Sequence, residues 1–301
     1  MKNLYGVTVA MITPFTEKGE VDCDSLSRLT EKLVEKGVNC LYPCGTTGEM
    51  VHLTAGERKR IAETVIKTAA GRVRVFIHCG AVRQEETEDL LLHAVSAGAD
   101  GAGIVTPMFL GVTDREMALY YKRMSDIVPE NFPLYLYNIP QCSGNDLNGE
   151  TAARIAKDCS NIIGIKYSFP DMLRTLEYLQ IPSFSVLHGC DKMFAELLMM
   201  GCDGTVSGVA GVFPEPFAAV YDAYLRKDPG EMRRWQEICI GFCDLLHCGS
   251  NMSWFKEALK CRGLSAGGMR APQRDLPREE TAGLREALAA LCEKAGIPLE
   301  M

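Results

Sequence analysis

Short runs of apolar and β-branched residues alternate with longer segments of helical periodicity along most of the chain. These runs predict eight strands, over residues 6–12, 39–43, 73–80, 101–106, 134–138, 162–167, 184–189 and 204–207. The run at 162–165 is apolar at every position instead of alternating with polar residues. Such strands are typical of a parallel sheet that is covered by helices on both faces.

The segments between the strands carry helix start and stop signals. Asp24 or Ser25 is expected to cap a helix that ends at Gly37, Thr54 precedes a helix that runs toward Ala70, residues 84–97 form a helix closed by Gly98, and later helices open at Asp114, Asn148, Asp171, Asp191 and Pro214. Eight strand-then-helix units in about 225 residues predict an α/β protein with a (β/α)8 barrel, because an open doubly wound sheet usually has fewer strands.

The strand signal stops after Lys227-Asp228-Pro229-Gly230. Residues 231–246, 254–262 and 278–296 have helical periodicity, and a segment with several Gly and Pro residues at 267–277 interrupts them. The sequence therefore predicts a barrel over residues 1–228 and a C-terminal helical region over residues 229–301.

Composition and charge narrow the class of protein. The 301 residues are 47% hydrophobic and 24% charged, which is typical of one large soluble domain. No apolar run reaches the roughly 18 residues of a membrane span, and the first residues do not have the pattern of a secretory signal, so a cytoplasmic protein is expected. The formal charge of −7 is spread without a basic block, which argues against nucleic acid as a partner.

The thirteen cysteines are odd in number and scattered along the chain, and Cys40 and Cys79 lie in apolar, strand-like runs. They are interpreted as reduced core residues. The closest spacings, Cys40 with Cys44 and Cys239 with Cys243, have no second pair or His set nearby that would complete a zinc site. We therefore expect no metal site, and the five histidines, which show no paired metal spacing, are interpreted mainly as structural.

Candidate chemistry is sought at the C-terminal ends of the strands, where (β/α)8 barrels carry their active sites. Lys166 directly follows the apolar run 162–165, and Lys is among the residues least tolerated in a buried strand. A desolvated amine there would have enough free base to attack a ketone carbonyl. The alternative is a Lys that reaches solvent or pairs with a carboxylate.

Other polar groups follow neighbouring strands. The phenol of Tyr137 could shuttle protons in the same cavity, although an isolated strand tyrosine more often packs and hydrogen-bonds to backbone. Gly45, Thr46 and Thr47 lie in the loop Gly-Thr-Thr-Gly, which could cradle a carboxylate or phosphate or could be an ordinary capped turn, and Glu49 could position it. The residues Gly189 and Asp191 and the segment 207–211 could contact the rest of a substrate or form caps and close-packed turns.

Three motifs together resemble the dihydrodipicolinate synthase and N-acetylneuraminate lyase superfamily: Gly-Thr-Thr-Gly-Glu at 45–49, Tyr-Asn-Ile-Pro at 137–140 and Gly-Ile-Lys at 164–166. Thr13-Pro14-Phe15, Thr106-Pro107 and the segment 256–260 extend the resemblance over nearly the whole chain.

The resemblance implies roles for the site residues. Lys166 would form a covalent imine with pyruvate or another 2-keto acid, Tyr137 would relay protons, Thr46 would link that relay, Thr47 would help to bind the carboxylate, and Val206 would contact pyruvate through its backbone. It also implies that no metal or organic cofactor is needed, that an aldehyde is the second substrate, and that the chain forms a homodimer or homotetramer.

Two departures from the synthase pattern limit that inference. Cys142 stands where dihydrodipicolinate synthases carry an Arg for the second substrate's carboxylate, and a thiol cannot replace a bidentate cation. Phe109 stands where the family commonly offers a Tyr hydroxyl to the neighbouring subunit's relay, so the relay would be shorter or would use another group such as water.

The resemblance to neuraminate lyases is also partial. The pattern Tyr-Asn-Ile-Pro-x-x-Ser-Gly at 137–144 and the pair Gly189 and Asp191 match them. Lys192 stands where those lyases tend to have an acidic residue, and Tyr167-Ser168 replaces their Gln-Thr.

The first hypothesis is a pyruvate-dependent Schiff-base lyase or aldolase that cleaves or forms a 4-hydroxy-2-oxo acid, such as a sugar acid or an N-acetylneuraminate-like compound. The alternatives are a 2-keto-3-deoxy acid dehydratase or deaminase, dihydrodipicolinate synthase itself, and a keto-acid-binding barrel without turnover.

Overall fold

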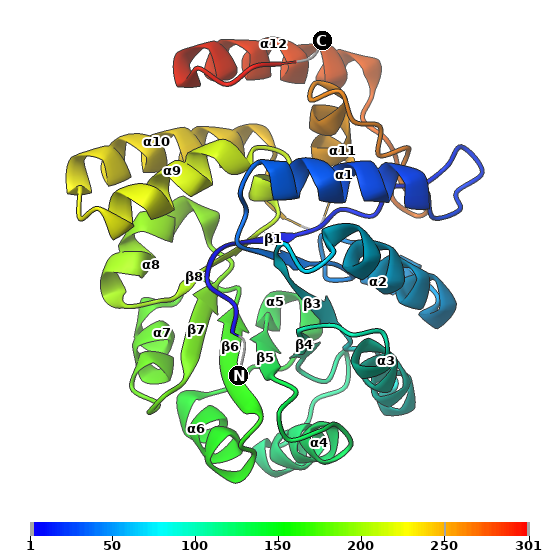
Figure 1. The fold of residues 1–301 in the computed structure, drawn as a ribbon, viewed down its shortest axis with the longest axis vertical. Coiled ribbons are helices and arrows are strands. Elements are labelled where there is room, and N and C mark those ends of the chain that lie inside the picture. The colour runs from blue at the N-terminus through cyan, green and yellow to red at the C-terminus, as the bar shows by residue number, and fades with distance from the viewer. Residues whose placement is uncertain (1–2, 250, 300–301) are drawn as a thin grey trace.

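The computed structural model describes residues 3–249 and 251–299, and its centre is a closed barrel of parallel strands (Figure 1). The strands are β1 (Gly6–Ala10), β2 (Cys40–Tyr42), β3 (Arg74–His78), β4 (Gly101–Val105), β5 (Leu134–Asn138), β6 (Ile162–Tyr167), β7 (Ser185–His188) and β8 (Gly204–Ser207). They pair in sequence order, and β1 also pairs with β8 to close the ring. The eight predicted strands and the (β/α)8 barrel are thereby confirmed.

Helices surround the barrel and extend beyond it (Figure 1). They are α1 (Cys23–Glu35), α2 (Ala55–Ala69), α3 (Gln84–Ser96), α4 (Asp114–Asp126), α5 (Pro140–Ser143), α6 (Gly149–Asp158), α7 (Met172–Leu179), α8 (Phe194–Met200), α9 (Pro214–Leu225), α10 (Pro229–Leu245), α11 (Ser253–Lys260) and α12 (Arg278–Ala295). Three short 3-10 helices are η1 (Met50–His52), η2 (Asp191–Met193) and η3 (Val209–Gly211).

Most helix starts follow the capping signals of the sequence, and three differ. Asp22, not Asp24 or Ser25, caps α1, because its carboxylate accepts hydrogen bonds from both the backbone N–H and the hydroxyl of Ser25. Thr113 caps α4 in a capping box, so Asp114 is the first helical residue. The segment that opens at Asp191 is first the 3-10 helix η2, and α8 begins only at Phe194.

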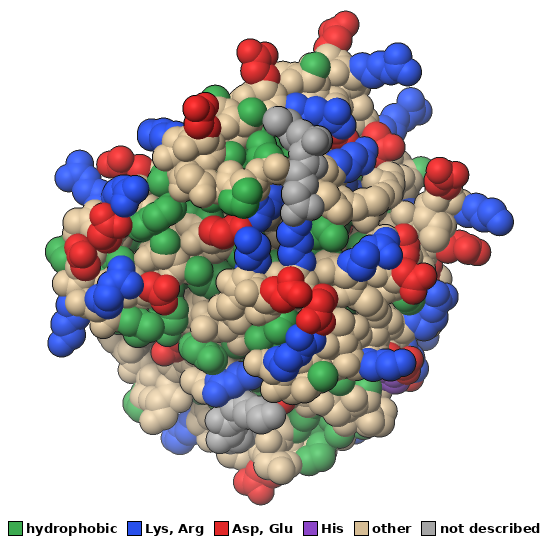
Figure 2. All heavy atoms as spheres, turned by 45° about the horizontal axis from the view of Figure 1, so that its top comes forward, with side chains coloured by type: hydrophobic (Ala, Val, Ile, Leu, Met, Phe, Trp, Pro, Cys, Tyr) green, Lys and Arg blue, Asp and Glu red, His purple; other side chains and the backbone are tan. Residues whose placement is uncertain are grey.

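The C-terminal helices pack on one side of the barrel. Helix α10 lies along α9, and α12 crosses above α10 and α11 at the top of Figure 1. The guanidinium of Arg285 on α12 donates to the carboxylate of Glu257 on α11 at 2.7 Å, and the side chains of Leu284 and Leu288 on α12 are buried. Basic and acidic side chains are interspersed over this face in Figure 2.

The barrel interior is filled by large side chains. Tyr42, Phe76, Tyr135, Leu187 and Val206, each from a different strand, belong to one buried cluster. The rings of Phe76 and Tyr135 meet edge to face with centroids 5.7 Å apart. This packed layer forms the floor beneath the residues at the C-terminal strand ends. Among the described residues, no helix has the length and apolar character that a membrane crossing requires.

Candidate active site

A cavity of about 940 Å³ opens at the C-terminal ends of the strands. Seven of the eight residues singled out from the sequence line it: Thr46, Thr47, Tyr137, Lys166, Gly189, Asp191 and Val206. Gly45 is not among the lining residues, since its carbonyl turns into the loop and accepts from the backbone N–H groups of Gly48 and Met50. A cavity of this size suits a substrate of several carbon atoms.

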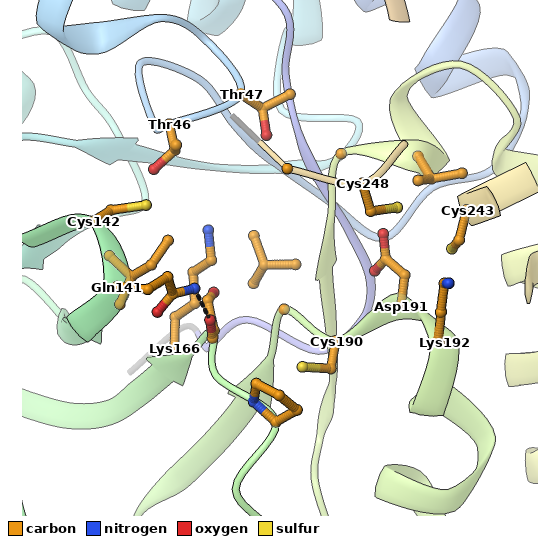
Figure 3. A pocket seen from close by; sticks show the side chains of 18 of the residues that line it. Thr46, Thr47, Gln141, Cys142, Lys166, Cys190, Asp191, Lys192, Cys243 and Cys248 are labelled. Carbon is orange, nitrogen blue, oxygen red and sulfur yellow. Dashed lines mark hydrogen bonds between the residues drawn. The ribbon is translucent and has the colours of Figure 1, made fainter. Parts of the chain in front are cut away.

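Two sides of the cavity differ in their chemistry (Figure 3). On one side lie Thr46, Thr47, Tyr137 and Lys166, here named the amine wall. On the other side lie Asp191, Cys243 and Cys248, here named the thiol wall.

Lys166 occupies the penultimate position of β6, opposite Tyr137 on β5 and Leu187 on β7. Its side chain is 4% exposed and points into the cavity (Figure 3). The Nζ atom lies 4.0 Å from the centre of the Tyr137 ring and 5.1 Å from that of Tyr42. Two π faces thus contact an amine that has little access to bulk water.

The phenol of Tyr137 is connected to the loop after β2. Its hydroxyl lies 3.2 Å from Oγ1 of Thr46, and either oxygen can donate in that hydrogen bond. Tyr137 itself is buried, so its hydroxyl is fixed by packing at the strand end. A proton could therefore pass between the cavity and Thr46 through two oxygens of known position.

The loop 45–49 has a shape that requires glycine at one position. The N–H groups of Gly48 and Glu49 donate to the carbonyls of Gly45 and Thr46, each at 3.0 Å, and Oγ1 of Thr13 donates to the carbonyl of Gly48 at 2.8 Å. A Cβ atom on Gly48 would come within 3.1 Å of the carbonyl of Met11 and 3.2 Å of the backbone nitrogen of Cys44. The tight turn presents Thr46 and Thr47 to the cavity.

Residues of the C-terminal helical segment support this loop from behind. Glu49 adopts a left-handed backbone conformation with φ 58°, and its carboxylate forms a fully buried ion pair with Nζ of Lys256 at 2.7 Å. Lys256 also donates to the carbonyl of Gly268 at 2.8 Å. Lys256 and Arg270 lie 4.2 Å from the ring centre of Phe15, and Arg270 bonds Glu57 at 3.0 Å. The sequence suggested a positioning role for Glu49, whereas Lys256 was noted only within the segment 256–260 that extends the family resemblance and was given no role.

Sequence reasoning also missed two residues beneath the amine. Tyr42 and His78 are completely buried, and the His78 ring meets that of Tyr137 edge to face at 5.6 Å. Nδ1 of His78 lies 3.0 Å from the carbonyl of Cys44, to which it must donate. Burial, with the nearby Arg58 and Lys166 cations, holds the pKa of His78 well below its ordinary value, so the ring is neutral. Period-two spacing from Cys40 and Phe76 could have identified both as inward-facing.

The thiol wall is built around Asp191. Its carboxylate accepts from Oγ of Ser207 at 2.7 Å and from Oγ1 of Thr205 at 3.1 Å. Burial raises the pKa of Asp191 to about 6, although these hydrogen bonds oppose the change. Gly189 precedes it where a Cβ atom would lie 2.2 Å from Oγ of Ser168, so only glycine fits between β6 and β7 at this point.

The two departures noted in the sequence lie in different surroundings. Cys142 is exposed and lines the cavity on the side of the amine wall, next to Gln141, whose amide donates to the carbonyl of Ser168 at 2.7 Å. Phe109 is 88% exposed, with φ 75°, and is not among the lining residues of the described cavity.

Comparisons with known proteins identify the family of this chain. Residues 3–291 match the model of the Dihydrodipicolinate synthetase family. An uncharacterized DapA-like lyase of Halobacterium salinarum is 34% identical over 289 residues, which cover 96% of this chain and 94% of that protein. The 4-hydroxy-tetrahydrodipicolinate synthase of Aquifex aeolicus is 34% identical over 300 residues, covering 98% and 99%.

A solved structure extends the comparison to three dimensions. YagE, a prophage protein of E. coli K12 crystallised in complex with pyruvate, matches with a TM-score of 0.91 at 28% identity and covers 96% of this chain and 99% of its own. Fold, family model and sequence relatives all extend over nearly the whole chain. The chain therefore belongs to the dihydrodipicolinate synthetase family and is an enzyme of the lyase class.

Proposed function

We propose that this enzyme is a pyruvate-dependent Schiff-base lyase that cleaves or forms a 4-hydroxy-2-oxo acid. The observation that carries the proposal is the buried amine of Lys166, 4.0 Å from the ring of Tyr137, whose hydroxyl lies 3.2 Å from Thr46. The pyruvate complex of YagE supports a 2-keto acid as the ligand of this site.

In the proposed reaction the Lys166 amine adds to the ketone carbon of the substrate. Tyr137 delivers a proton to the carbinolamine oxygen, water leaves, and an iminium ion forms. In cleavage, the 4-hydroxyl loses its proton and the bond between C3 and C4 breaks. The electron pair of the C3–C4 bond passes into the iminium ion, which becomes an enamine, and C4 leaves as the carbonyl carbon of a free aldehyde. Protonation at C3 and hydrolysis release pyruvate and regenerate the amine.

The loop after β2 is suited to the keto-acid carboxylate. Thr47 lines the cavity beside Thr46, and its hydroxyl is available at the amine wall. Val206 on β8 lies in the same cavity, where its backbone can contact a small bound acid. A short acid anchored there would present its ketone carbon to Lys166.

The remainder of the cavity favours a hydroxylated partner over a second carboxylate. Lys166 and Lys192 are the only Lys or Arg side chains among the described lining residues, and Lys192 already pairs with Asp244. The Cys142 thiol supplies no charge where related synthases are expected to carry Arg. Asp191, Ser168 and Gln141 offer hydrogen-bonding groups instead. These features support a sugar-acid-like substrate over aspartate semialdehyde.

The test is borohydride trapping with pyruvate, followed by peptide mass mapping. Wild-type protein is expected to carry a reduced pyruvyl adduct on Lys166, and Lys166→Ala should carry none. Lys192→Ala is the matched control, because Lys192 lines the same cavity and should leave the adduct in place. An unmodified Lys166 in folded protein would contradict the proposal.

Product analysis then distinguishes the reactions that share the imine. Release of pyruvate from 4-hydroxy-2-oxo acids identifies the aldolase. Turnover of 2-keto-3-deoxy acids without pyruvate release identifies a dehydratase or deaminase, and condensation with aspartate semialdehyde identifies the synthase. An adduct without turnover of any of these compounds would identify a keto-acid-binding barrel.

A further inference from the structure

The thiol wall brings together three potential metal ligands from distant parts of the chain. Cys243 lies in the last turn of α10, Cys248 follows that helix, and Asp191 begins η2 after β7. The Sγ atoms of the two cysteines and a carboxylate oxygen of Asp191 all lie within 4.8 Å of one another. Figure 3 shows these side chains gathered on the side of the cavity away from Lys166 and Cys142.

The end of α10 explains why the two cysteines meet. His247 adopts a left-handed conformation with φ 46°, and the backbone N–H of Cys248 donates to the carbonyl of Cys243 at 3.3 Å. The chain therefore reverses over the last helical turn and places the exposed Cys248 thiol against the buried Cys243 thiol. Four residues lie between the two cysteines in the sequence, so the closest cysteine spacings did not indicate this pair.

The carboxylate of Asp191 is fixed by its own partners. Ser207 donates to one oxygen and Thr205 to the other, at 2.7 and 3.1 Å. In metal sites, partners of this kind orient a ligand and preserve its geometry before the ion arrives. The backbone N–H of Val209 is a third donor to this carboxylate, which has about four lone-pair positions, so one position is left with which it could bind a cation.

The charge of the cluster also favours a cation. Its three groups are all acids, and Lys192, the residue next to Asp191, pairs with Asp244 instead. The carbonyl end of α10 contributes a further partial negative charge.

We propose that Cys243, Cys248 and Asp191 form a binding site for one soft divalent cation, with zinc as its representative, on the wall of the active-site cavity. Tetrahedral zinc, with bonds of about 2.3 Å to sulfur and about 2.1 Å to oxygen, places its ligand atoms roughly 3.5–3.8 Å apart. Ligand atoms within 4.8 Å of one another need only small side-chain adjustments to reach that geometry. Binding releases the two thiol protons to solvent and changes no oxidation state.

The fourth coordination position faces the cavity, because all three ligands line it. Water or a polar group of a bound molecule would complete the coordination there. An ion at this wall would occupy space that the outer part of a long substrate also needs. The site would thus be inhibitory, and it is separate from the Schiff-base chemistry proposed for Lys166.

The test uses full-length, reduced, metal-free protein titrated with Co²⁺ and then with Zn²⁺. Co²⁺ bound to thiolates gives an intense sulfur-to-metal charge-transfer absorption, which Zn²⁺ should abolish by displacement. Elemental analysis after gel filtration is expected to give one Zn²⁺ per chain. Neither readout depends on catalytic turnover, so a failure of the proposed reaction would leave this result unaffected.

Cys248→Ser is the decisive variant, because Cys248 is exposed and its loss should not disturb the core. Its affinity for Zn²⁺ is expected to fall by at least about tenfold. A loss of that size is usual when a residue that only hydrogen-bonds to a metal ligand is removed, and Cys248 would be a ligand itself. Cys142→Ser is the matched control, since it removes another exposed thiol of the same cavity and should bind Zn²⁺ as the wild type does.

Inhibition gives a second readout in which each variant is compared with itself in the absence of metal. Zn²⁺ should slow turnover by the wild type and by Cys142→Ser at concentrations that leave Cys248→Ser unaffected. The proposal is overturned if Cys248→Ser binds Zn²⁺ as tightly as the wild type, or if Co²⁺ gives no thiolate charge-transfer absorption. Far-UV circular dichroism verifies that every variant is folded.

Discussion

The amine wall and the thiol wall face the same cavity but are assembled in different ways. Every group of the amine wall lies at the end of a barrel strand or in the loop directly after it. The thiol wall takes both of its cysteines from α10 and the segment that follows, outside the barrel. Candidate functional groups at strand ends can therefore be predicted from the sequence. Groups that a packed helix contributes to the cavity are identified only from the structure.

The strongest test of the amine wall is Tyr137→Phe, which removes one oxygen and preserves the ring. We expect kcat to fall by about 10²–10⁴-fold, the usual contribution of a positioned proton donor. The Phe ring would still contact Lys166, so the thermal unfolding midpoint should change little. Steady-state kinetics with the substrate identified by product analysis measure the effect. A loss of less than tenfold would show that another group relays the proton.

Lys256→Met tests whether the C-terminal helical segment also supports the amine wall. It leaves the Glu49 carboxylate buried without its cation, so the free energy of unfolding should fall by about 3–5 kcal/mol. Urea unfolding measures this change. The double variant Lys256→Met with Glu49→Gln should regain part of the loss, because no charge remains buried. Equal losses in the single and double variants would contradict the assigned role of the pair.

The pH dependence of the free energy of unfolding tests whether buried His188 supports the thiol wall. The backbone N–H of Cys190 donates to its Nδ1 at 3.1 Å, and Nε2 lies 3.3 Å from Oγ1 of Thr175. Burial lowers the pKa of His188 from 6.5 to about 4, so the unfolded chain takes up this proton first as the pH falls. The stabilisation that neutral His188 contributes is fully present above pH 6.5. It is lost as the pH falls toward 4, and the free energy of unfolding decreases by up to about 3 kcal/mol.

The variant His188→Asn keeps a hydrogen-bond acceptor but cannot titrate in this window. The difference in unfolding free energy between the wild type and His188→Asn should therefore shrink as the pH is lowered from 7 to 4. Urea unfolding at a series of pH values measures that difference, from which the titration of Asp191 and other shared groups cancels. Parallel curves for the two proteins would refute the prediction.

The smallest expected effect is that of Cys142→Ser. The side chain is exposed and forms no part of either wall. Its stability should stay within about 0.5 kcal/mol of the wild type, as for most surface substitutions. Borohydride trapping on Lys166 should also be unchanged. A substantial loss of trapped adduct would mean that Cys142 contributes to the amine wall after all.

The barrel could be predicted because its signals are local. Each strand is a short apolar run, and residues such as Asn148 and Asp171 cap helices through their own side chains. The cap of α1 was placed wrongly because Asp22, Asp24 and Ser25 all have suitable side chains, and only the geometry selects Asp22. Short elements such as α5 and η1 were not predicted, since a single turn carries no periodicity.

The residues of the candidate site also differ in whether a local sequence pattern predicts their position. Lys166 and Tyr137 lie close together because β5 and β6 are neighbours, which follows from their order in the sequence. The register that places them opposite each other depends on a shift between Leu134 and Tyr135, which the sequence does not reveal. Lys256 reaches the Thr46 loop from behind and Cys248 reaches the cavity through the packing of the C-terminal helices. No local pattern specifies where such a helix docks. The sequence thus predicted most of the cavity residues near the strand ends, although it missed Tyr42 and His78 beneath the amine, and it predicted none of those contributed by the C-terminal helices.

The ion pair between Arg270 and Glu57 joins residues 213 positions apart, and β1 pairs with β8 to close the ring. Contacts of such long sequence separation are slow to form, and a chain emerging from the ribosome folds from its N-terminus. Lys166 is thus synthesised well before the residues that hold the Thr46 loop in place. We expect a nascent chain to contain the Lys166 amine long before its active site is assembled, because the site is complete only after residues 256–270 have been synthesised and packed.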